Sequence, residues 1–102
     1  MKIVSVIFFI FASAVLYADL IDDALVAHRN GNYEQAIQNY MQACNNGNAK
    51  GCLGIGSLYF LGQGVKKDIK TAQNYFEKGC KAGNKRACYN YKACSTLKYK
   101  TH

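Results

Sequence analysis

The sequence repeats itself with a period of 36 residues, and this repeat constrains the fold more than any other feature. Shifting the chain by 36 places Cys44 on Cys80 and Cys52 on Cys88, so the spacing C-x7-C occurs twice. Other residues superimpose in the same shift: Ala36 on Ala72, Tyr40 on Phe76, Gly47 on Gly83 and Asn48 on Asn84. Such self-similarity is typical of arrays in which each unit packs only on its neighbours.

Apolar spacing within the repeat predicts helices. Apolar or small residues recur three or four positions apart in three stretches: Tyr33, Ala36, Ile37, Tyr40 and Cys44; Cys52, Ile55, Leu58 and Tyr59; Ile69, Ala72, Phe76, Gly79 and Cys80. Residues 20–29 and 85–96 are predicted to form two further helices, and the chain contains no proline to interrupt any of them. We therefore expect an all-α fold, a short α/α solenoid of antiparallel helix hairpins cross-linked by disulfides.

Polar residues and glycines predict where these helices begin and end. Asn32 and Gln35 have the spacing of a reciprocal capping box, and Asp68 is placed to cap the equivalent helix of the next repeat. Gly47 and Gly83 are expected to stop the helices that precede them, as glycine commonly does. A further glycine, Gly54, lies inside a predicted helix, which indicates the close approach of a neighbouring backbone.

The five cysteines are the most informative residues for stability. A C-x7-C segment spans a helix end, a turn and the next helix start, so its thiols can lie opposite each other as disulfide geometry requires. We expect Cys44 to pair with Cys52 and Cys80 with Cys88. Cys94 has no counterpart 36 residues earlier, where Leu58 stands. It is either a buried apolar thiol or a handle for an intermolecular bond that would form a dimer.

The same cysteines do not predict a metal site. C-x7-C is not the spacing of zinc ligands, and only His28 and His102 are available to assist. We expect neither a metal nor a cofactor.

The N-terminus has the pattern of a secretory signal peptide. Lys2 precedes an apolar run over 3–16, which is shorter than a membrane span, and cleavage is expected after Ala18. The alternative is an uncleaved membrane anchor. The first interpretation gives a signal peptide over 1–18 and a repeat domain over 19–102, with no membrane span after processing and a periplasmic or secreted location. Within that domain we expect repeats over about 19–48 and 49–84, and a partial capping repeat over 85–102.

The charge of the chain favours anionic partners without identifying one. The chain has 13 Lys and Arg residues against 6 Asp and Glu residues, a formal net charge of +7. The basic residues form no nucleic-acid recognition motif, and export argues against such a ligand, so we expect no nucleic-acid partner. Most tyrosines are spaced as core residues, although they could also line a ligand groove.

The chain resembles the Sel-one-like repeats, a class of helical repeat related to the tetratricopeptide repeat. The resemblance rests on residues 51–68, GCLGIGSLYFLGQGVKKD, followed by Ala72, Tyr75, Phe76 and Cys80. In particular the chain is similar to the cysteine-rich secreted members known from Helicobacter and related bacteria, whose hairpins carry C-x7-C disulfides. The likeness covers essentially all of 19–102, with a shortened first repeat and a degraded last one.

The resemblance implies two classes of function. Many members of the class bind proteins or peptides, which is the function we expect here. The cysteine-rich members are described as penicillin-binding proteins with weak β-lactamase activity, which implies a β-lactam or a peptidoglycan fragment as the alternative ligand. Ser95 and Lys98 satisfy the S-x-x-K spacing of a serine β-lactamase, but no Ser-Asp-Asn or Lys-Thr-Gly motif accompanies them. These two residues are therefore weak catalytic candidates, and the sequence leaves enzymatic activity open.

Overall fold

The computed structural model describes the backbone of residues 19–100 and the side chains of residues 19–97. The described residues form five helices and no strand: residues 19–29, α2 (Tyr33–Asn45), α3 (Ala49–Leu61), α4 (Ile69–Lys81) and α5 (Lys85–Lys100). The predicted all-α fold with disulfide cross-links is confirmed. The predicted signal peptide over 1–18 and His102 lie outside the described residues.

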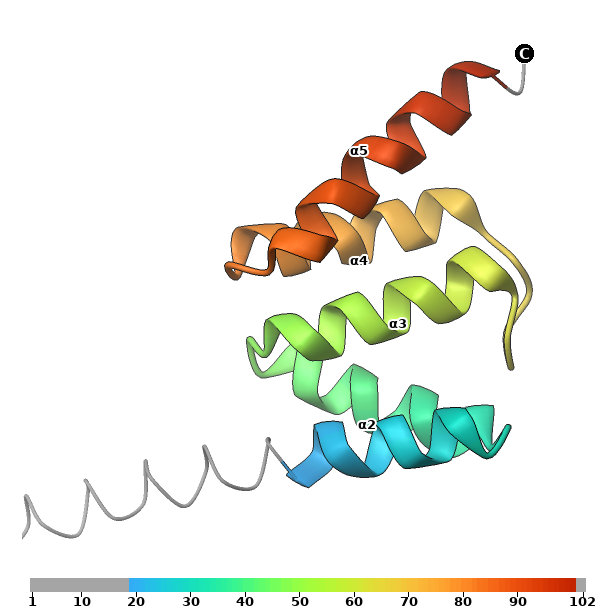
Figure 1. Cartoon of the computed structure of the whole chain (residues 1–102), viewed down its shortest axis with the longest axis vertical. Helices are drawn as coiled ribbons and strands as arrows, with labels where there is room; N and C mark the ends of the chain where they lie inside the picture. The colour runs from blue at the N-terminus through green and yellow to red at the C-terminus, as the bar shows by residue number, and fades with distance from the viewer. Residues whose placement is uncertain (1–18, 101–102) are drawn as a thin grey trace, which may run out of the picture.

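The helices run antiparallel in a stack that follows the order of the sequence (Figure 1). The helix over 19–29, α3 and α5 form the nearer layer in this view, and α2 and α4 lie behind them. Helix α3 packs against α2 on one side and α4 on the other, while α4 packs against α5. Each element therefore contacts its neighbours along the chain, as expected of a solenoid.

An Asn or Asp residue precedes each of the last four helices and caps its first turn. The side-chain oxygens of Asn32, Asn48, Asp68 and Asn84 accept hydrogen bonds from backbone N–H groups two or three residues later. These caps satisfy donors that would otherwise lack a partner at the helix start. The reciprocal half of the predicted capping box is wrong, because the backbone N–H of Asn32 donates to the carbonyl oxygen of Ala27 at 2.8 Å. The side-chain amide nitrogen of Gln35 donates to Asn39 Oδ1 at 3.0 Å.

The core consists of two clusters that meet at α3. The first joins the helix over 19–29 to α2 and α3 through buried residues: Ile21, Ala24, Ala27, Ala36, Tyr40, Ala43, Cys44, Cys52, Ile55 and Leu58. The second joins α4 to α5 through Ala72, Phe76 and Cys94, with Leu53 and Tyr91 packed against it. Because α3 contributes to both clusters, it is the helix whose packing most depends on its neighbours on both sides.

Two glycines of α3 allow the close packing on α2. A Cβ atom on Gly51 would lie 2.7 Å from Cys44 N and 2.8 Å from Tyr40 O, so the two backbones meet here. At Gly54 the sequence correctly indicates a close approach, but the group that approaches is the Tyr40 ring, 2.5 Å from an added Cβ, rather than a backbone. The backbone contact lies one turn earlier, at Gly51.

Two disulfides link α2 to α3 and α4 to α5, at turns on the same side of the stack (Figure 1). Cys44 is bonded to Cys52 with a Cα separation of 4.6 Å, and Cys80 to Cys88 with a separation of 4.4 Å. The turns between them contain Gly47 and Gly83, whose φ angles of 87° and 102° few other residues adopt. Within residues 19–100, no helix is long and apolar enough to cross a membrane.

Candidate functional site

A groove crosses the layer formed by the helix over 19–29, α3 and α5. Its wider part has a volume of about 470 Å³ and lies between the first described helix and α3, reaching the start of α5. The residues that line it are Ile21, Leu25, His28, Tyr40, Lys50, Leu53, Gly54, Ser57, Asn84 and Arg86. Gly54 lacks a side chain at its centre, and the ring of Tyr40 from α2 forms the floor there.

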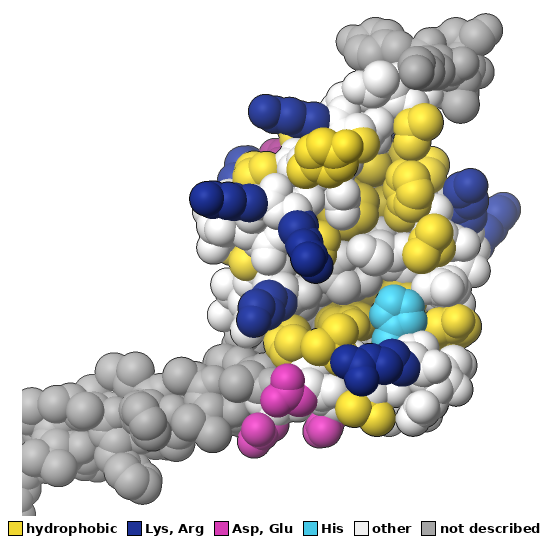
Figure 2. All heavy atoms as spheres, in the orientation of Figure 1, with side chains coloured by type: hydrophobic (Ala, Val, Ile, Leu, Met, Phe, Trp, Pro, Cys, Tyr) yellow, Lys and Arg dark blue, Asp and Glu magenta, His cyan; other side chains and the backbone are white. Residues whose placement is uncertain are grey.

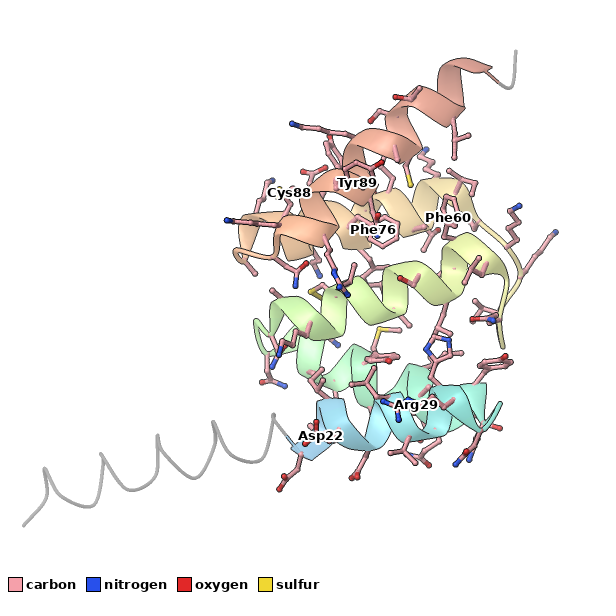
Figure 3. All side chains as sticks on the ribbon, in the orientation of Figure 1. Asp22, Arg29, Phe60, Phe76, Cys88 and Tyr89 are labelled. Atoms are coloured by element: carbon pink, nitrogen blue, oxygen red, sulfur yellow. A yellow bond between two sulfur atoms is a disulfide. The ribbon has the colours of Figure 1, made fainter. Side chains whose placement is uncertain are left out.

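A smaller, more apolar recess continues the groove toward the other end of α3. It has a volume of about 160 Å³ and is lined by Ser57, Phe60, Leu61, Phe76, Asn90 and Ala93. Ser57 lines both hollows, so they lie next to each other on α3. Phe76 reaches this recess from α4 between α3 and α5, while Phe60 comes from α3 (Figure 3). Leu61 remains 57% exposed, so the recess opens to solvent beside an apolar side chain.

Basic side chains lie along one edge of the groove. Lys50 and Arg86 are exposed, and neither forms an ion pair within the described part of the chain, where Lys81 and Glu77 form the one salt bridge. Lys50 and Arg86 are equivalent positions of the repeat, each two residues after a capping asparagine. Figure 2 shows this face, with dark blue side chains around yellow apolar ones. An acidic group on a ligand would meet both cations without first breaking an internal ion pair.

A hydrogen-bonded cluster holds the opposite edge. His28 Nε2 lies 2.9 Å from Gln63 Oε1, and Gln63 Nε2 donates to the hydroxyl of Tyr33 at 3.3 Å. The His28 ring also meets the rings of Tyr33 and Tyr40 edge to face. These contacts fasten the loop that follows α3 to the preceding hairpin and fix the position of His28 in the groove wall.

The Tyr40 side chain at the floor of the groove consists of an apolar ring and a polar hydroxyl group. Its side chain is buried, and burial raises the pKa of its hydroxyl above the ordinary value, against a smaller opposing effect of Arg29. The phenol therefore stays neutral in the physiological range and can donate or accept one hydrogen bond. Ser57 and Asn84 are further neutral polar residues in the lining of the groove.

The Ser95 hydroxyl lies away from this groove. It accepts a hydrogen bond from Gln73 Nε2 at 2.6 Å and donates one to the carbonyl oxygen of Tyr91 at 3.2 Å. Both bonds fix Ser95 between α4 and α5, and its proton is held by the carbonyl of its own helix. The side chain of Lys98, the other half of the S-x-x-K pair, lies outside the described residues.

The described cysteines have two different surroundings. Cys44, Cys52, Cys80 and Cys88 form the two disulfides described above. Cys94 is a free thiol with only 1% of its side chain exposed, and burial raises the pKa of this thiol. Of the two interpretations left open by the sequence, its position favours the buried apolar thiol. Among residues 19–97, no group of three or more potential ligand residues lies close enough to hold a metal ion.

Comparison with known proteins agrees with this architecture. The model of the Sel1 repeat family matches residues 27–48 and 49–84, together more than half of the chain. The chain belongs to the Sel1 repeat family. A 42-residue stretch is 40% identical to a Helicobacter pylori protein named "Putative beta-lactamase HcpE", in each of two strains, strain 26695 and strain J99. The match spans 41% of this chain but only 12% of that protein, and no solved structure matches the chain.

The sequence did not single out the groove residues Lys50, Ser57 and Arg86. The 36-residue shift that aligns the cysteines also aligns Lys50 with Arg86, so the periodic basic position was available as a signal. These side chains border a hollow because three helices pack together, and the repeat alignment carries no information about that packing. Of the tyrosines, Tyr89 differs from the core position expected for most of them, because 75% of its side chain is exposed.

Proposed function

We propose that this Sel1 repeat protein is an exported binding module whose groove holds a peptide segment of a partner protein. The observation that carries the proposal is a pair of adjoining hollows over three helices. One is an apolar recess, and the other has a basic edge that forms no ion pair within the described residues. Binding sites of this kind use apolar lining for affinity and a few polar groups for orientation. The two disulfides and the apolar run over 3–16 support a periplasmic or secreted location.

The groove defines the chemistry of the ligand. The recess of about 160 Å³ has room for one apolar side chain against Phe60 and Phe76. Lys50 and Arg86 would attract a carboxylate further along the same peptide, and Ser57, which lines both hollows, offers a hydroxyl for a hydrogen bond. We therefore expect a ligand with an apolar residue followed or preceded by an acidic one.

Selection from a displayed peptide library on the immobilised, oxidised protein tests this proposal. We expect enriched peptides to pair an apolar with an acidic residue. Ala93→Phe, which fills the recess, and the double variant Lys50→Glu with Arg86→Glu should each weaken binding at least about tenfold, because each removes one anchor. Lys66→Glu with Lys67→Glu makes the same charge change on the loop after α3, outside the groove, and should leave binding intact.

Two results would contradict the proposal. One is that selection on the oxidised protein enriches no peptide more strongly than selection on the reduced, unfolded protein. The other is a set of peptides that bind the groove variants as tightly as the unchanged chain, which would place their binding site elsewhere.

A second candidate, binding or hydrolysis of a β-lactam or a peptidoglycan fragment, is favoured by the name of the Helicobacter pylori relative. It lacks support from the Ser95 site, where the hydroxyl is already bonded to Gln73 and Tyr91. Incubation with a chromogenic cephalosporin tests it. Turnover that disappears in Ser95→Ala would identify a nucleophile, and absence of turnover would leave the binding function alone.

Export has its own test. The signal peptide and the domain boundaries proposed from the sequence predict that protein recovered from the cell envelope or medium begins at Asp19. N-terminal sequencing of that material checks the prediction, and an intact N-terminus in a membrane fraction would indicate the uncleaved anchor instead.

A further inference from the structure

The two ends of the helix stack carry opposite charges. Residues 19–30 contain three aspartates, Asp19, Asp22 and Asp23, against the single cation Arg29. The segment from Lys78 to the end of the sequence contains seven Lys and Arg residues and no acidic residue. In Figure 2 the magenta side chains gather at the end of the stack formed by residues 19–29, and dark blue ones lie over α4 and α5 at the other end.

At the acidic end, the outer face of the first described helix has no packing partner within the described part of the chain. Its buried residues, Ile21, Ala24 and Ala27, face α2 and α3. The opposite side presents Asp22, Val26 and Arg29 at helical spacing, and all three are exposed. Val26 is 54% exposed, although it is an apolar residue one turn from Asp22 and Asp23. We call this surface the head face.

At the basic end, α5 has a similar outer surface of opposite charge. Its buried residues, Ala87 and Cys94, face the core. Lys85, Tyr89 and Lys92 follow each other at intervals of four and three residues on the other side, and all three are exposed. Tyr89 presents a ring that is 75% exposed between the two lysines. We call this surface the tail face, and Figure 3 shows Tyr89 and Asp22 at the two ends of the stack.

The tail face differs from a surface that receives another repeat helix. In α3, Gly56 makes room for the next helix, because an added Cβ there would lie 2.6 Å from the Phe76 ring of α4. The position 36 residues later in α5 is Lys92, whose long charged side chain occupies this place. An occupant of the tail face must therefore offer carboxylates to the lysines and an apolar contact to Tyr89. The head face offers carboxylates from Asp22 and the neighbouring, exposed Asp23, and an apolar contact from Val26. Its one cation, Arg29, lies three residues beyond Val26, on the side away from the two aspartates along the helix.

We propose that copies of this chain associate head to tail, the basic tail face of one copy on the acidic head face of the next. Asp22 and Asp23 then pair with Lys85 and Lys92 of the neighbouring copy, and Val26 packs on Tyr89. The two faces are different surfaces of one molecule, so the contact is heterologous and leads to an open row of copies rather than a closed dimer. None of these residues lines the groove, so each copy in the row keeps its groove open.

Because the contact depends on exposed charges around one small apolar pair, it should be weak and sensitive to salt. Screening shortens the range of such interactions from about 30 Å at 0.01 M salt to about 3 Å at 1 M. We therefore expect association at low ionic strength and high protein concentration, and dissociation when salt is added. Association through exposed apolar surface alone would respond in the opposite direction.

Charge-swapped variants of the full chain, expressed for export and purified in the oxidised form, test the proposal by sedimentation velocity. The head variant carries Asp22→Lys and Asp23→Lys, and the tail variant carries Lys85→Glu and Lys92→Glu. Each variant alone has two like-charged faces and should stay monomeric at low salt where the unchanged chain associates. An equimolar mixture of the two should associate again, since each face then meets an opposite one.

Circular dichroism of every variant checks that it is folded, and Lys66→Glu with Lys67→Glu serves as the control for net charge. The control should associate as the unchanged chain does. The proposal is overturned if the unchanged chain is monomeric at low salt at all concentrations. It is also overturned if both swapped variants still associate, or if their mixture stays monomeric.

Discussion

At the scale of single residues, two glycines of α3 allow this helix to pack closely on α2, because they have no side chain. Gly51 and Gly54 let the backbone and a ring of α2 approach α3 at distances that a Cβ would prevent. Alanine is normally the better helix residue by about 1 kcal/mol, so retaining glycine here costs helix propensity. The close packing of Tyr40 and the short approach at Cys44 require glycine at these positions, despite its lower helix propensity.

We predict that Gly51→Ala destabilises the protein by about 2 kcal/mol, despite the gain in helix propensity. The added methyl would lie 2.7 Å from a backbone nitrogen and 2.8 Å from Ala43 Cβ, so two helices must separate. Urea unfolding followed by circular dichroism measures the change. Gln38→Ala, on the exposed side of α2, is the control and should shift stability by less than about 0.5 kcal/mol. An unchanged or raised stability in Gly51→Ala would show that the helices are not packed this closely.

A second prediction at this scale concerns Cys94. The thiol is buried and burial raises its pKa, so the fraction present as reactive thiolate is small and shielded. We expect iodoacetamide to label Cys94 slowly in the native, oxidised protein and rapidly in urea, as measured by mass spectrometry of the peptide. Native labelling at the rate of an exposed cysteine would favour the alternative role as a handle for an intermolecular bond.

At the scale of helices, the caps set the boundaries of the repeat. Asn32 and Asp68 are 36 residues apart, as are Asn48 and Asn84, and all four accept backbone hydrogen bonds at helix starts. These positions were readable from sequence because a cap depends on a few consecutive residues. The missing reciprocal bond of Gln35 was not readable, since the Asn32 N–H donates to the carbonyl of Ala27 in the preceding helix.

Asp68 makes one of these caps dependent on pH. Hydrogen bonds from the backbone N–H and hydroxyl of Thr71 lower the pKa of this carboxyl below its usual 3.8. A lowered folded-state pKa means that the stabilisation is present above the unfolded pKa and is lost as pH falls through the folded one. We predict that the urea midpoint of the unchanged chain exceeds that of Asp68→Asn at pH 7 and that the difference shrinks as the pH falls below the ordinary carboxyl pKa of 3.8. A difference independent of pH would contradict the role of the charge.

At the scale of the whole molecule, two hairpins and a final helix provide little core, and the disulfides compensate. Each bond closes a nine-residue loop, worth about 2.5 kcal/mol on the chain-entropy model, against a total of about 5–15 kcal/mol for a small domain. The two bonds differ in access. Cys44 of α2 and Cys52 of α3 are buried in the first core cluster, whereas Cys80 of α4 and Cys88 of α5 are partly exposed.

We predict that limiting reductant opens Cys80–Cys88 before Cys44–Cys52, because thiol–disulfide exchange requires access to a sulfur. Alkylation of the partly reduced protein and peptide mapping would reveal the order. Complete reduction should remove most of the helical signal in circular dichroism. The double variant that lacks the second bond, Cys80→Ser with Cys88→Ser, should retain more of this signal than the double variant that lacks the first, Cys44→Ser with Cys52→Ser. Equal helicity before and after full reduction would show that the fold does not depend on the bonds.

The sequence by itself determined the helices, their caps and the family, because each depends on local spacing or on a repeat that superimposes on itself. The spacing of Cys44, Cys52, Cys80 and Cys88 made their pairing readable for the same reason. The tertiary structure alone decided where the groove lies, that Tyr40 is its floor, and that the Ser95 hydroxyl is bonded to Gln73. These features arise where residues far apart in the sequence meet, such as Tyr40 with Gly54 and Gln73 with Ser95. Only the packing of helices determines which side chains fill a shared space and which leave it open.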